Sequence, residues 1–245
     1  MMQSIYWTGR VLSRAIRNGL SSLSSAAELN VSNKKYPYLV SVVCGFPKDI
    51  ANGRTHKGQF GDDAWFSTNF NNADVIGSST ACVMILDRNE SIMRAANIGD
   101  SGYMVVRGGR VVHRSHEQQH YFNTPYQLSL PPPGHDRNVL SDRPESAETA
   151  EFRVECGDVI LVATDGVFDN VPEPVLVAEM RRAQGEAGDA QRLQAVANSI
   201  AWMARNLSFD GCYMSPFAKS ARQNGIDAIG GKPDDITVLL AIVAL

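Results

Sequence analysis

Aspartates that stand beside glycine, or beside a second aspartate, are the residues of this sequence that could do chemistry. They occur at Gly61-Asp62-Asp63, Gly99-Asp100-Ser101-Gly102, Thr164-Asp165-Gly166 and Pro233-Asp234-Asp235. An aspartate at a strand end allows a sharp turn and leaves its carboxylate beyond the sheet edge. One such residue is ordinarily a turn former, but four, three of them with apolar strands behind them, indicate converging carboxylates. Carboxylates without His or Cys suit Mg²⁺ or Mn²⁺, and two such ions could polarise a phosphoryl group and supply a hydroxide.

A second motif, His116-Glu117-Gln118-Gln119-His120, has the spacing of the zinc site H-E-x-x-H. That chemistry requires a helix, which presents both histidines to one ion. The motif here follows a strand hairpin and runs into a proline-rich loop over residues 124–145. Asn123 and Tyr126 stand where the longer form of this zinc motif has Gly and His. We therefore expect a polar loop rather than a zinc protease.

The elements that would position these residues follow from the hydrophobic patterning. Short runs rich in Val, Ile and aromatic residues predict strands from about residue 37 to 113, with a Gly108-Gly109 hairpin, and two more strands surround Gly157-Asp158. The period then changes, and residues 173–184, 189–207 and 215–224 are predicted to be helical. Residues 234–245 are almost wholly apolar, which indicates a buried final strand. This order predicts an α+β fold with stacked sheets.

Composition limits the function classes. The chain has 245 residues, 44% of them hydrophobic, and a net charge of −3, which fits one globular domain and argues against a nucleic-acid partner. The cysteines Cys44, Cys82, Cys156 and Cys212 are far apart and form no CxxC pair, so we expect reduced thiols. No run of 18 apolar residues is present, so no transmembrane segment is predicted.

Residues 1–30 differ from the rest of the chain. They contain no acidic residue before Glu28, and Arg10, Arg14 and Arg17 recur at helical spacing opposite a leucine-rich face. An Arg- and Ser-rich, acid-poor amphipathic helix is typical of a mitochondrial presequence. The alternative is an ordinary amphipathic surface helix. We expect a mitochondrial protein, most simply in the matrix, with residues 37–245 as its folded domain.

Several of these motifs, in order, resemble the metal-dependent type 2C Ser/Thr protein phosphatases. The similar stretches are "GDDAWF", "ANIGDSGYMVVRGG", "ATDGVFDN" and "GGKPDDITVLLAIV". The stretches "RSHEQQHYFNTPYQLSLPPP" and "YMSPFAKSARQNG" are similar to the mitochondrial branch of that family linked to coenzyme Q biosynthesis. The resemblance runs from about residue 38 to the end of the chain. It implies an antiparallel β-sandwich with helices on both outer faces and a site for two Mg²⁺ or Mn²⁺ ions at one end.

The resemblance also implies roles for individual residues. Asp63 matches a metal-ligating aspartate with Asp62 as its acidic neighbour, and Asp165 and Asp234 match two further metal ligands. Asp100 is expected to hold a turn beneath the site, and Lys57 lies where the family keeps a basic residue for the substrate phosphate. We expect in-line attack of a metal-activated hydroxide on phosphoserine or phosphothreonine in protein substrates, with no phosphoenzyme.

The stretch "NNADVIGSSTACVMILD", residues 71–87, raises a further question. Gly77-Ser78-Ser79 could be the turn of a tight hairpin. In the family, however, the strand similar to "ADVIG" continues into an Asp-Gly-x-Gly-Gly motif whose Asp bridges both metals, and about sixty residues follow, including a helical pair. No such motif occurs in residues 70–90. The resemblance therefore implies a block missing after Gly77, loss of one helical pair and impaired catalysis. The alternative function is a pseudophosphatase that binds partners without turnover.

Overall fold

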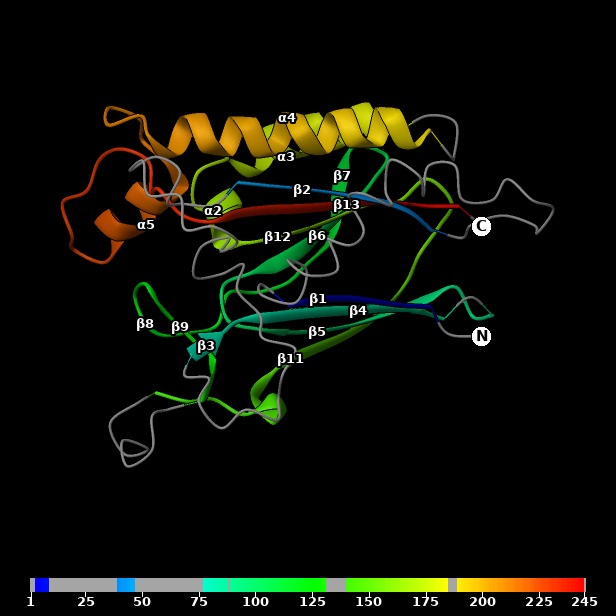
Figure 1. The fold of residues 1–245 in the computed structure, drawn as a ribbon, viewed down its shortest axis with the longest axis horizontal. Coiled ribbons are helices and arrows are strands. Elements are labelled where there is room, and N and C mark those ends of the chain that lie inside the picture. Colours follow the sequence, from blue (N-terminus) through cyan, green and yellow to red (C-terminus); the bar gives the residue numbers. More distant parts are fainter. Residues whose placement is uncertain are drawn as a thin grey trace.

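Two antiparallel sheets stack face to face, and helices cover one side of the stack (Figure 1). The computed structural model describes residues 3–8, 39–46, 77–87, 89–130, 140–184 and 189–244. The five-stranded sheet has the order β2-β13-β12-β6-β7, and the four-stranded sheet has the order β1-β4-β5-β11. The predicted α+β sandwich is therefore confirmed.

The elements have the following bounds. The strands of the five-stranded sheet are β2 (Leu39–Phe46), β6 (Gly102–Arg107), β7 (Arg110–Arg114), β12 (Val159–Ala163) and β13 (Ile236–Val243). Those of the four-stranded sheet are β1 (Gln3–Thr8), β4 (Ala81–Asp87), β5 (Ile92–Ile98) and β11 (Glu148–Arg153). Two small ribbons pair β3 (Gly77–Ser79) with β10 (Leu128–Leu130) and β8 (Gln119–Tyr121) with β9 (Thr124–Pro125). The helices are η2 (Pro144–Ser146), α2 (Asp165–Phe168), α3 (Glu173–Ala183), α4 (Ala190–Ser208) and α5 (Pro216–Gln223).

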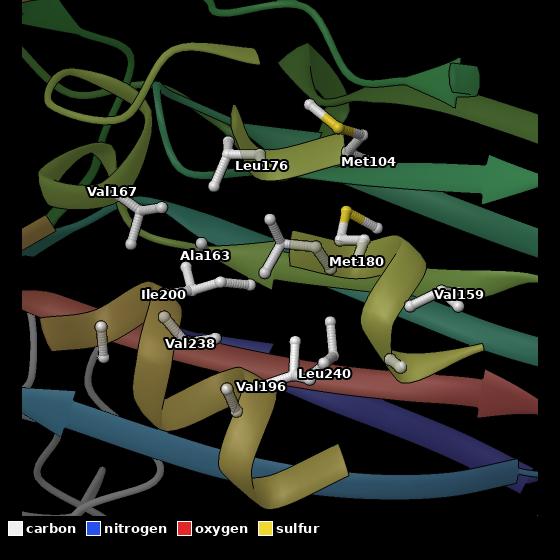
Figure 2. Packing of buried hydrophobic residues seen from close by; sticks show 14 of the residues in the cluster. Met104, Val159, Ala163, Val167, Leu176, Met180, Val196, Ile200, Val238 and Leu240 are labelled. Carbon is white, nitrogen blue, oxygen red and sulfur yellow. The ribbon is translucent and has the colours of Figure 1, made fainter. Parts of the chain in front are cut away.

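The burial of residues along β12 and β13 follows from the two cores, one on each face of the five-stranded sheet. All five residues of β12 are buried, because β12 is central to its sheet and has a core on each face. Alternate residues of β12 and β13 face the helices, where Val196 and Ile200 of α4 lie over Val238 and Leu240 (Figure 2). The other residues of these strands face the four-stranded sheet and form a second core. A strand buried on both faces must be apolar throughout, and the apolar run in residues 234–245 correctly indicated such a strand.

The three predicted late helices are confirmed as α3, α4 and α5, and local capping sets two of their starts. The carboxylate of Asp189 accepts a hydrogen bond of 2.9 Å from the backbone N–H of Arg192 at the start of α4. The hydroxyl of Ser215 accepts one of 3.0 Å from Ala218 N–H at the start of α5. Each contact satisfies a donor that the first helical turn leaves without an intrahelical acceptor.

The outer face of the four-stranded sheet is not covered by any helix among the described residues (Figure 1). Along β4, burial alternates strictly, so that Met84 is buried while its neighbours Val83 and Ile85 are only partly so. A hollow of about 490 Å³ lies on this face and is lined by Val83, Ile85, Arg94, Ala95, Ala96, Thr149, Ala150 and Glu151. Helices on both outer faces, which the family resemblance implies, are thus found on one side only in the part of the chain that the structure describes.

Several local predictions are settled by the strand pairing. Gly108 and Gly109 form the predicted hairpin turn between β6 and β7, each with a positive φ. The hairpin interpretation of Gly77-Ser78-Ser79 is wrong, because these residues form β3 and pair with β10. The strands on either side of Gly157-Asp158 lie in different sheets and are not a hairpin. Part of the 124–145 loop forms β9 and β10.

The predicted N-terminal helix lies outside the described residues. The N-terminal helix was predicted around Arg10, Arg14 and Arg17, which are not described; the preceding residues form β1 and pair with β4. Its role as a presequence stays a prediction. Among the helices that the structure describes, none is long and apolar enough to cross a bilayer.

Candidate functional site

The antiparallel pairing of β12 with β13 brings two of the predicted aspartates to one end of the five-stranded sheet. Ala163 at the end of β12 lies opposite Val238 near the start of β13. Asp165 follows β12 as the first residue of α2, and Asp234 precedes β13. Two residues that are far apart in sequence therefore meet because one strand ends where its neighbour begins.

A lysine lies between these carboxylates. The ammonium Nζ of Lys232 donates to Asp165 Oδ2 and to Asp169 Oδ2, both at 2.7 Å, and lies 3.5 Å from Asp234 Oδ2. All four side chains are mostly buried, with exposed fractions of 12–20%. The residues Asp165, Asp169, Lys232 and Asp234 are called the carboxylate–lysine cluster below.

The geometry of α2 places Asp169 in the cluster. Asp165 begins the helix, and Asp169, four residues later, has helical backbone angles of φ −69° and ψ −24° at its C-cap. Residues four apart on a helix project from the same face. Both carboxylates therefore point to one side of α2, where each accepts a hydrogen bond from the Lys232 ammonium.

The backbone of Lys232 is fixed by the fully buried side chain of Asn170. Asn170 Nδ2 donates to the carbonyl of Lys232 at 2.8 Å, and the N–H of Lys232 donates to Asn170 Oδ1 at 2.8 Å. Above the ammonium lies the ring of Phe217, whose centroid is 5.3 Å from Nζ, a cation–π arrangement. These contacts direct a loop lysine into the cluster.

Close packing holds the two loops together. The hydroxyl of Thr164 donates to the carbonyl of Asp235 at 2.8 Å and accepts from Thr237 N–H at 3.0 Å. A Cβ on Gly166 would collide with the carbonyl oxygen of Asp235 and lie 3.1 Å from its carbonyl carbon. Glycine is therefore required at position 166 because a backbone passes directly against it.

In the cluster, one ammonium faces three carboxylates. Burial raises the pKa of Asp165, and it raises that of Asp169 to about 7, although Lys232 opposes both shifts. Burial alone would lower the pKa of Lys232, but attraction to Asp165 and Asp169 outweighs it and the pKa is raised. The exposed carboxylate of Glu117 adds repulsion at Asp169. A cation beside Asp165 and Asp169 therefore favours their charged forms, which burial disfavours.

The sequence-predicted residues are placed as follows. Asp165 and Asp234 are brought together around Lys232, whereas Asp62, Asp63 and Lys57 lie outside the described residues. Asp100 is buried in the turn between β5 and β6, at the same end of the sheet, since Gly102 lies opposite Ala163. Its neighbour Gly99 has φ +97°, and its N–H is bound by Gln118 Oε1 at 3.3 Å.

Sequence reasoning missed Asp169 and Lys232 as members of the cluster. Both stand in motifs that were singled out, since Asp169 ends "DGVFD" and Lys232 lies in "GGKPDD". The spacing of Asp165 and Asp169 by four residues was the available signal for the first. No comparable signal existed for Lys232, because its position depends on Asn170 across the fold.

The HEQQH motif does not form a zinc site. It runs through a loop into β8 and is not helical. Its two histidines bind different carboxylates, with His116 Nδ1 2.6 Å from Glu148 Oε1 and His120 Nε2 3.0 Å from Asp142 Oδ2. The helical presentation that this chemistry needs is therefore missing.

The carboxylate–lysine cluster has some of the ligands that a hard divalent cation needs. Among the residues that the structure describes, no group of three or more His, Cys, Asp or Glu side chains is arranged to hold a metal ion by itself. The carboxylates of Asp165, Asp169 and Asp234 nevertheless surround a cation already, the Lys232 ammonium. Oxygen donors of this kind suit Mg²⁺ or Mn²⁺. The described residues therefore fit part of such a site.

Comparison with solved structures identifies the fold. The chain superposes on the photosystem II phosphatase PBCP with a TM-score of 0.61 at 22% identity, covering 100% of this chain and 98% of that one. The fold is that of a type 2C (PP2C) phosphatase, as the sequence motifs implied. No protein-family model matches the chain.

Comparison with curated proteins gives the family. The chain is 40% identical to protein phosphatase PTC7 homologues of Homo sapiens and Danio rerio, covering 99% of this chain and 99% of each relative. It is 52% identical to the PTC7 homologue fig of Drosophila virilis over 69% of this chain and 54% of that one. The chain belongs to the PTC7 homologues, which are protein phosphatases of the PP2C type. The alignments with the human and zebrafish proteins span 304 positions, whereas this chain has 245 residues.

Proposed function

We propose that the chain is a phosphatase that hydrolyses phosphoserine and phosphothreonine in proteins and that depends on Mg²⁺ or Mn²⁺. The observation that carries this proposal is the convergence of Asp165 and Asp234 on one cation position at the end of the central strands. Both residues match metal ligands in the family motifs, and the chain is 40% identical to protein phosphatases over nearly its whole length. When bound, two divalent ions would polarise the phosphoryl group and activate the attacking water.

The chain's own residues would serve this reaction by binding charge. Asp165 and Asp234 would hold the cations, together with Asp63 and its neighbour Asp62. Thr164 and Gly166 keep the Asp165 loop against the Asp235 backbone, so that the two ligand loops stay in register. Lys57 would bind the substrate phosphate.

A cysteine nucleophile is not part of this proposal. Cys82 and Arg88 do have the C-x5-R spacing found in phosphatases that form a phosphocysteine. Cys82, however, is fully buried between the two sheets, and burial raises the pKa of its thiol to about 12. A protonated thiol inside the core neither reaches a phosphoprotein nor attacks it. Direct attack by water fits the chain better.

We further propose that catalysis by this chain is impaired because a block that follows residue 77 in its relatives is missing. The 304-position alignments leave at least 59 positions without a residue of this chain. The 169-residue match to the Drosophila virilis relative has the same length as the segment from Gly77 to Leu245. The outer face of the four-stranded sheet, which no helix among the described residues covers, also agrees with a lost helical pair. A partner-binding pseudophosphatase is therefore the second candidate function.

The N-terminal segment supports a third part of the proposal, import into mitochondria. The support is its composition, with three arginines at helical spacing and no acid before Glu28. Residues 1–30 fused to a fluorescent protein should accumulate in the matrix. Replacement of Arg10, Arg14 and Arg17 by glutamine should abolish that accumulation, and a cytosolic wild-type fusion would contradict the proposal.

The activity is tested by Mn²⁺-dependent phosphate release from a phosphothreonine peptide. We expect slow release by the 245-residue chain and faster release by a chimera that carries the human relative's aligned block after Gly77. Asp165→Asn should abolish release in the chimera. Asp227→Asn is the matched control, because the Asp227 side chain is 98% exposed. Release by the wild-type chain equal to that of the chimera would exclude impairment, and no release by the chimera would exclude the phosphatase assignment.

A further inference from the structure

The ammonium of Lys232 takes a position that a bound cation would need. It donates to Asp165 and Asp169 at 2.7 Å and lies 3.5 Å from Asp234. Two of these three carboxylates are the metal ligands assigned above. An ammonium and a divalent ion that use the same oxygens would be forced close together, and like charges at that separation repel strongly in a poorly solvated site. The two cations therefore exclude each other from this cluster.

The lysine has a clear function when no metal is bound. Three mostly buried carboxylates without a cation would repel one another at the junction of β12, α2 and β13. One ammonium removes part of that repulsion and satisfies two carboxylate oxygens by hydrogen bonds. A divalent ion at the same oxygens would carry twice the positive charge of the ammonium.

The fold also permits the ammonium to leave. Both hydrogen bonds between Asn170 and Lys232 are to the lysine backbone, not to its ammonium group. The side chain is 17% exposed, and its Nζ lies beside the Phe217 ring. A flexible four-carbon side chain can therefore rotate toward solvent while the backbone and both aspartate loops stay in position.

We propose that Lys232 is a built-in substitute for the metal: it holds the carboxylates together in the metal-free protein and is displaced when a divalent ion binds. This inference rests on the proposed function, because it takes the cluster as part of a metal site. It makes Lys232 a determinant of metal affinity rather than a catalytic residue. A divalent ion must compete with an internal cation, so the measured affinity is lower than the carboxylates alone would give.

The test uses the full 245-residue chain with Lys232→Met, which has similar length and no charge. Lys219→Met is the matched control, because Lys219 is the other lysine among the described residues and is exposed on α5. In EDTA, Lys232→Met should lower the melting temperature by on the order of 10 °C, because the buried carboxylates of Asp165 and Asp169 lose the ammonium that binds both of them. Its Kd for Mn²⁺, measured from the free-ion EPR signal, should fall by about tenfold. The reason is that the Lys232 ammonium no longer competes with Mn²⁺ for the carboxylates. Lys219→Met should change neither quantity.

Stability falls while Mn²⁺ affinity rises only for a displaced lysine. A lysine that simply supports the fold, or that assists metal binding, predicts that Lys232→Met lowers both stability and Mn²⁺ affinity. Equal or weaker Mn²⁺ binding by Lys232→Met would therefore overturn the proposal. Lys232→Arg retains the positive charge, and we expect it to keep most of the stability in EDTA without tighter Mn²⁺ binding.

A measurement on the wild-type chain covers the case in which Lys232→Met does not fold. Acetylation by an N-hydroxysuccinimide ester, followed by peptide mass spectrometry, reports the accessibility of each ammonium. Adding Mn²⁺ should increase the acetylation rate of Lys232 several-fold and leave that of Lys219 unchanged. An unchanged or slower rate at Lys232 while Mn²⁺ binds would contradict displacement.

The outcomes also separate this inference from the proposed function. If the chain binds Mn²⁺ and the chimera releases phosphate, but Lys232→Met binds Mn²⁺ no more tightly, only the lysine proposal fails. If neither the chain nor the chimera binds Mn²⁺ or releases phosphate, the metal-dependent phosphatase assignment fails, and displacement fails with it.

Discussion

Asn170 and Lys232 bind each other by two hydrogen bonds that run in opposite directions, although 62 residues separate them in sequence. Asn170 Nδ2 also donates to the carbonyl of Gly166 at 2.9 Å, so one buried amide links α2 to the loop before β13. The side chain of Asn170 is fully buried. It therefore sets the distance between the two loops that carry Asp165 and Asp234.

Replacing Asn170 with alanine should destabilise the chain by about 2–4 kcal/mol. The substitution removes three hydrogen bonds and leaves buried backbone groups of Lys232 and Gly166 without partners. Urea unfolding followed by circular dichroism measures the change. Asn198→Ala is the control, because Asn198 is exposed on α4 and should cost well under about 1 kcal/mol. Equal losses in the two variants would contradict the role of Asn170.

Replacing Gly166 with alanine should separate the β12 and β13 loops. The new Cβ would collide with the backbone of Asp235, and a backbone cannot move aside as a side chain can. We expect a loss of about 1–3 kcal/mol in the free energy of unfolding, the usual cost of overpacking. Gly211→Ala serves for comparison, since a Cβ there meets nothing within 4 Å. A Gly166→Ala protein as stable as Gly211→Ala would show that the loops are not in close contact.

The metal-free chain should lose stability as the pH rises from about 4 to about 7. Asp169 has an ordinary pKa of 3.8, and burial raises it to about 7 in the fold. Between these values the folded state binds more protons at Asp169 than the unfolded state, so the free energy of unfolding decreases with pH. The contribution is fully present below pH 3.8 and is lost as the pH passes about 7.

Asp169→Asn is the variant that tests this pH dependence. It keeps the size of the side chain and removes the titrating group, so its stability in EDTA should vary less between pH 4 and 7. Unfolding at a series of pH values, in EDTA, measures both proteins. Parallel stability curves would mean that Asp169 is not responsible.

Adjacent residues of β4 should tolerate truncation very differently. Leu86 is fully buried between the sheets, and Leu86→Ala should cost about 2–5 kcal/mol. Ile85 lies on the outer face of the sheet, which no described helix covers, and lines the hollow there, so Ile85→Ala should cost about 1 kcal/mol or less. Denaturant unfolding compares the two variants. Similar costs would indicate that another part of the chain covers this face.

Most of the described fold could be predicted from the sequence because hydrophobic patterns match the two cores. Val196 and Ile200 recur at helical spacing and indeed face the sheet in α4. The unbroken apolar run of β13 indicated burial on both faces, and it has a core on each side. The pattern does not give strand partners, and so a hairpin turn was one possible interpretation of Gly77-Ser78-Ser79, which in fact pairs with β10.

The site was predictable where backbone geometry alone decides it. Asp165 and Asp234 flank the facing ends of two apolar strands, and antiparallel pairing is sufficient to bring them together. Lys232 could not be predicted in this way. Its side chain enters the cluster because Asn170 fixes its backbone and its Nζ lies beside the Phe217 ring, and both contacts depend on the folded loops.

The order of the five-stranded sheet has a consequence for synthesis on the ribosome. β2 is made early, yet the only described strand beside it is β13, which is translated after every other strand described here. Until β13 emerges, β2 has no ladder partner in this sheet, and β12 has one open edge. A nascent chain paused before Ile236 would therefore expose two apolar strand edges, and chaperone binding would be most needed at that stage.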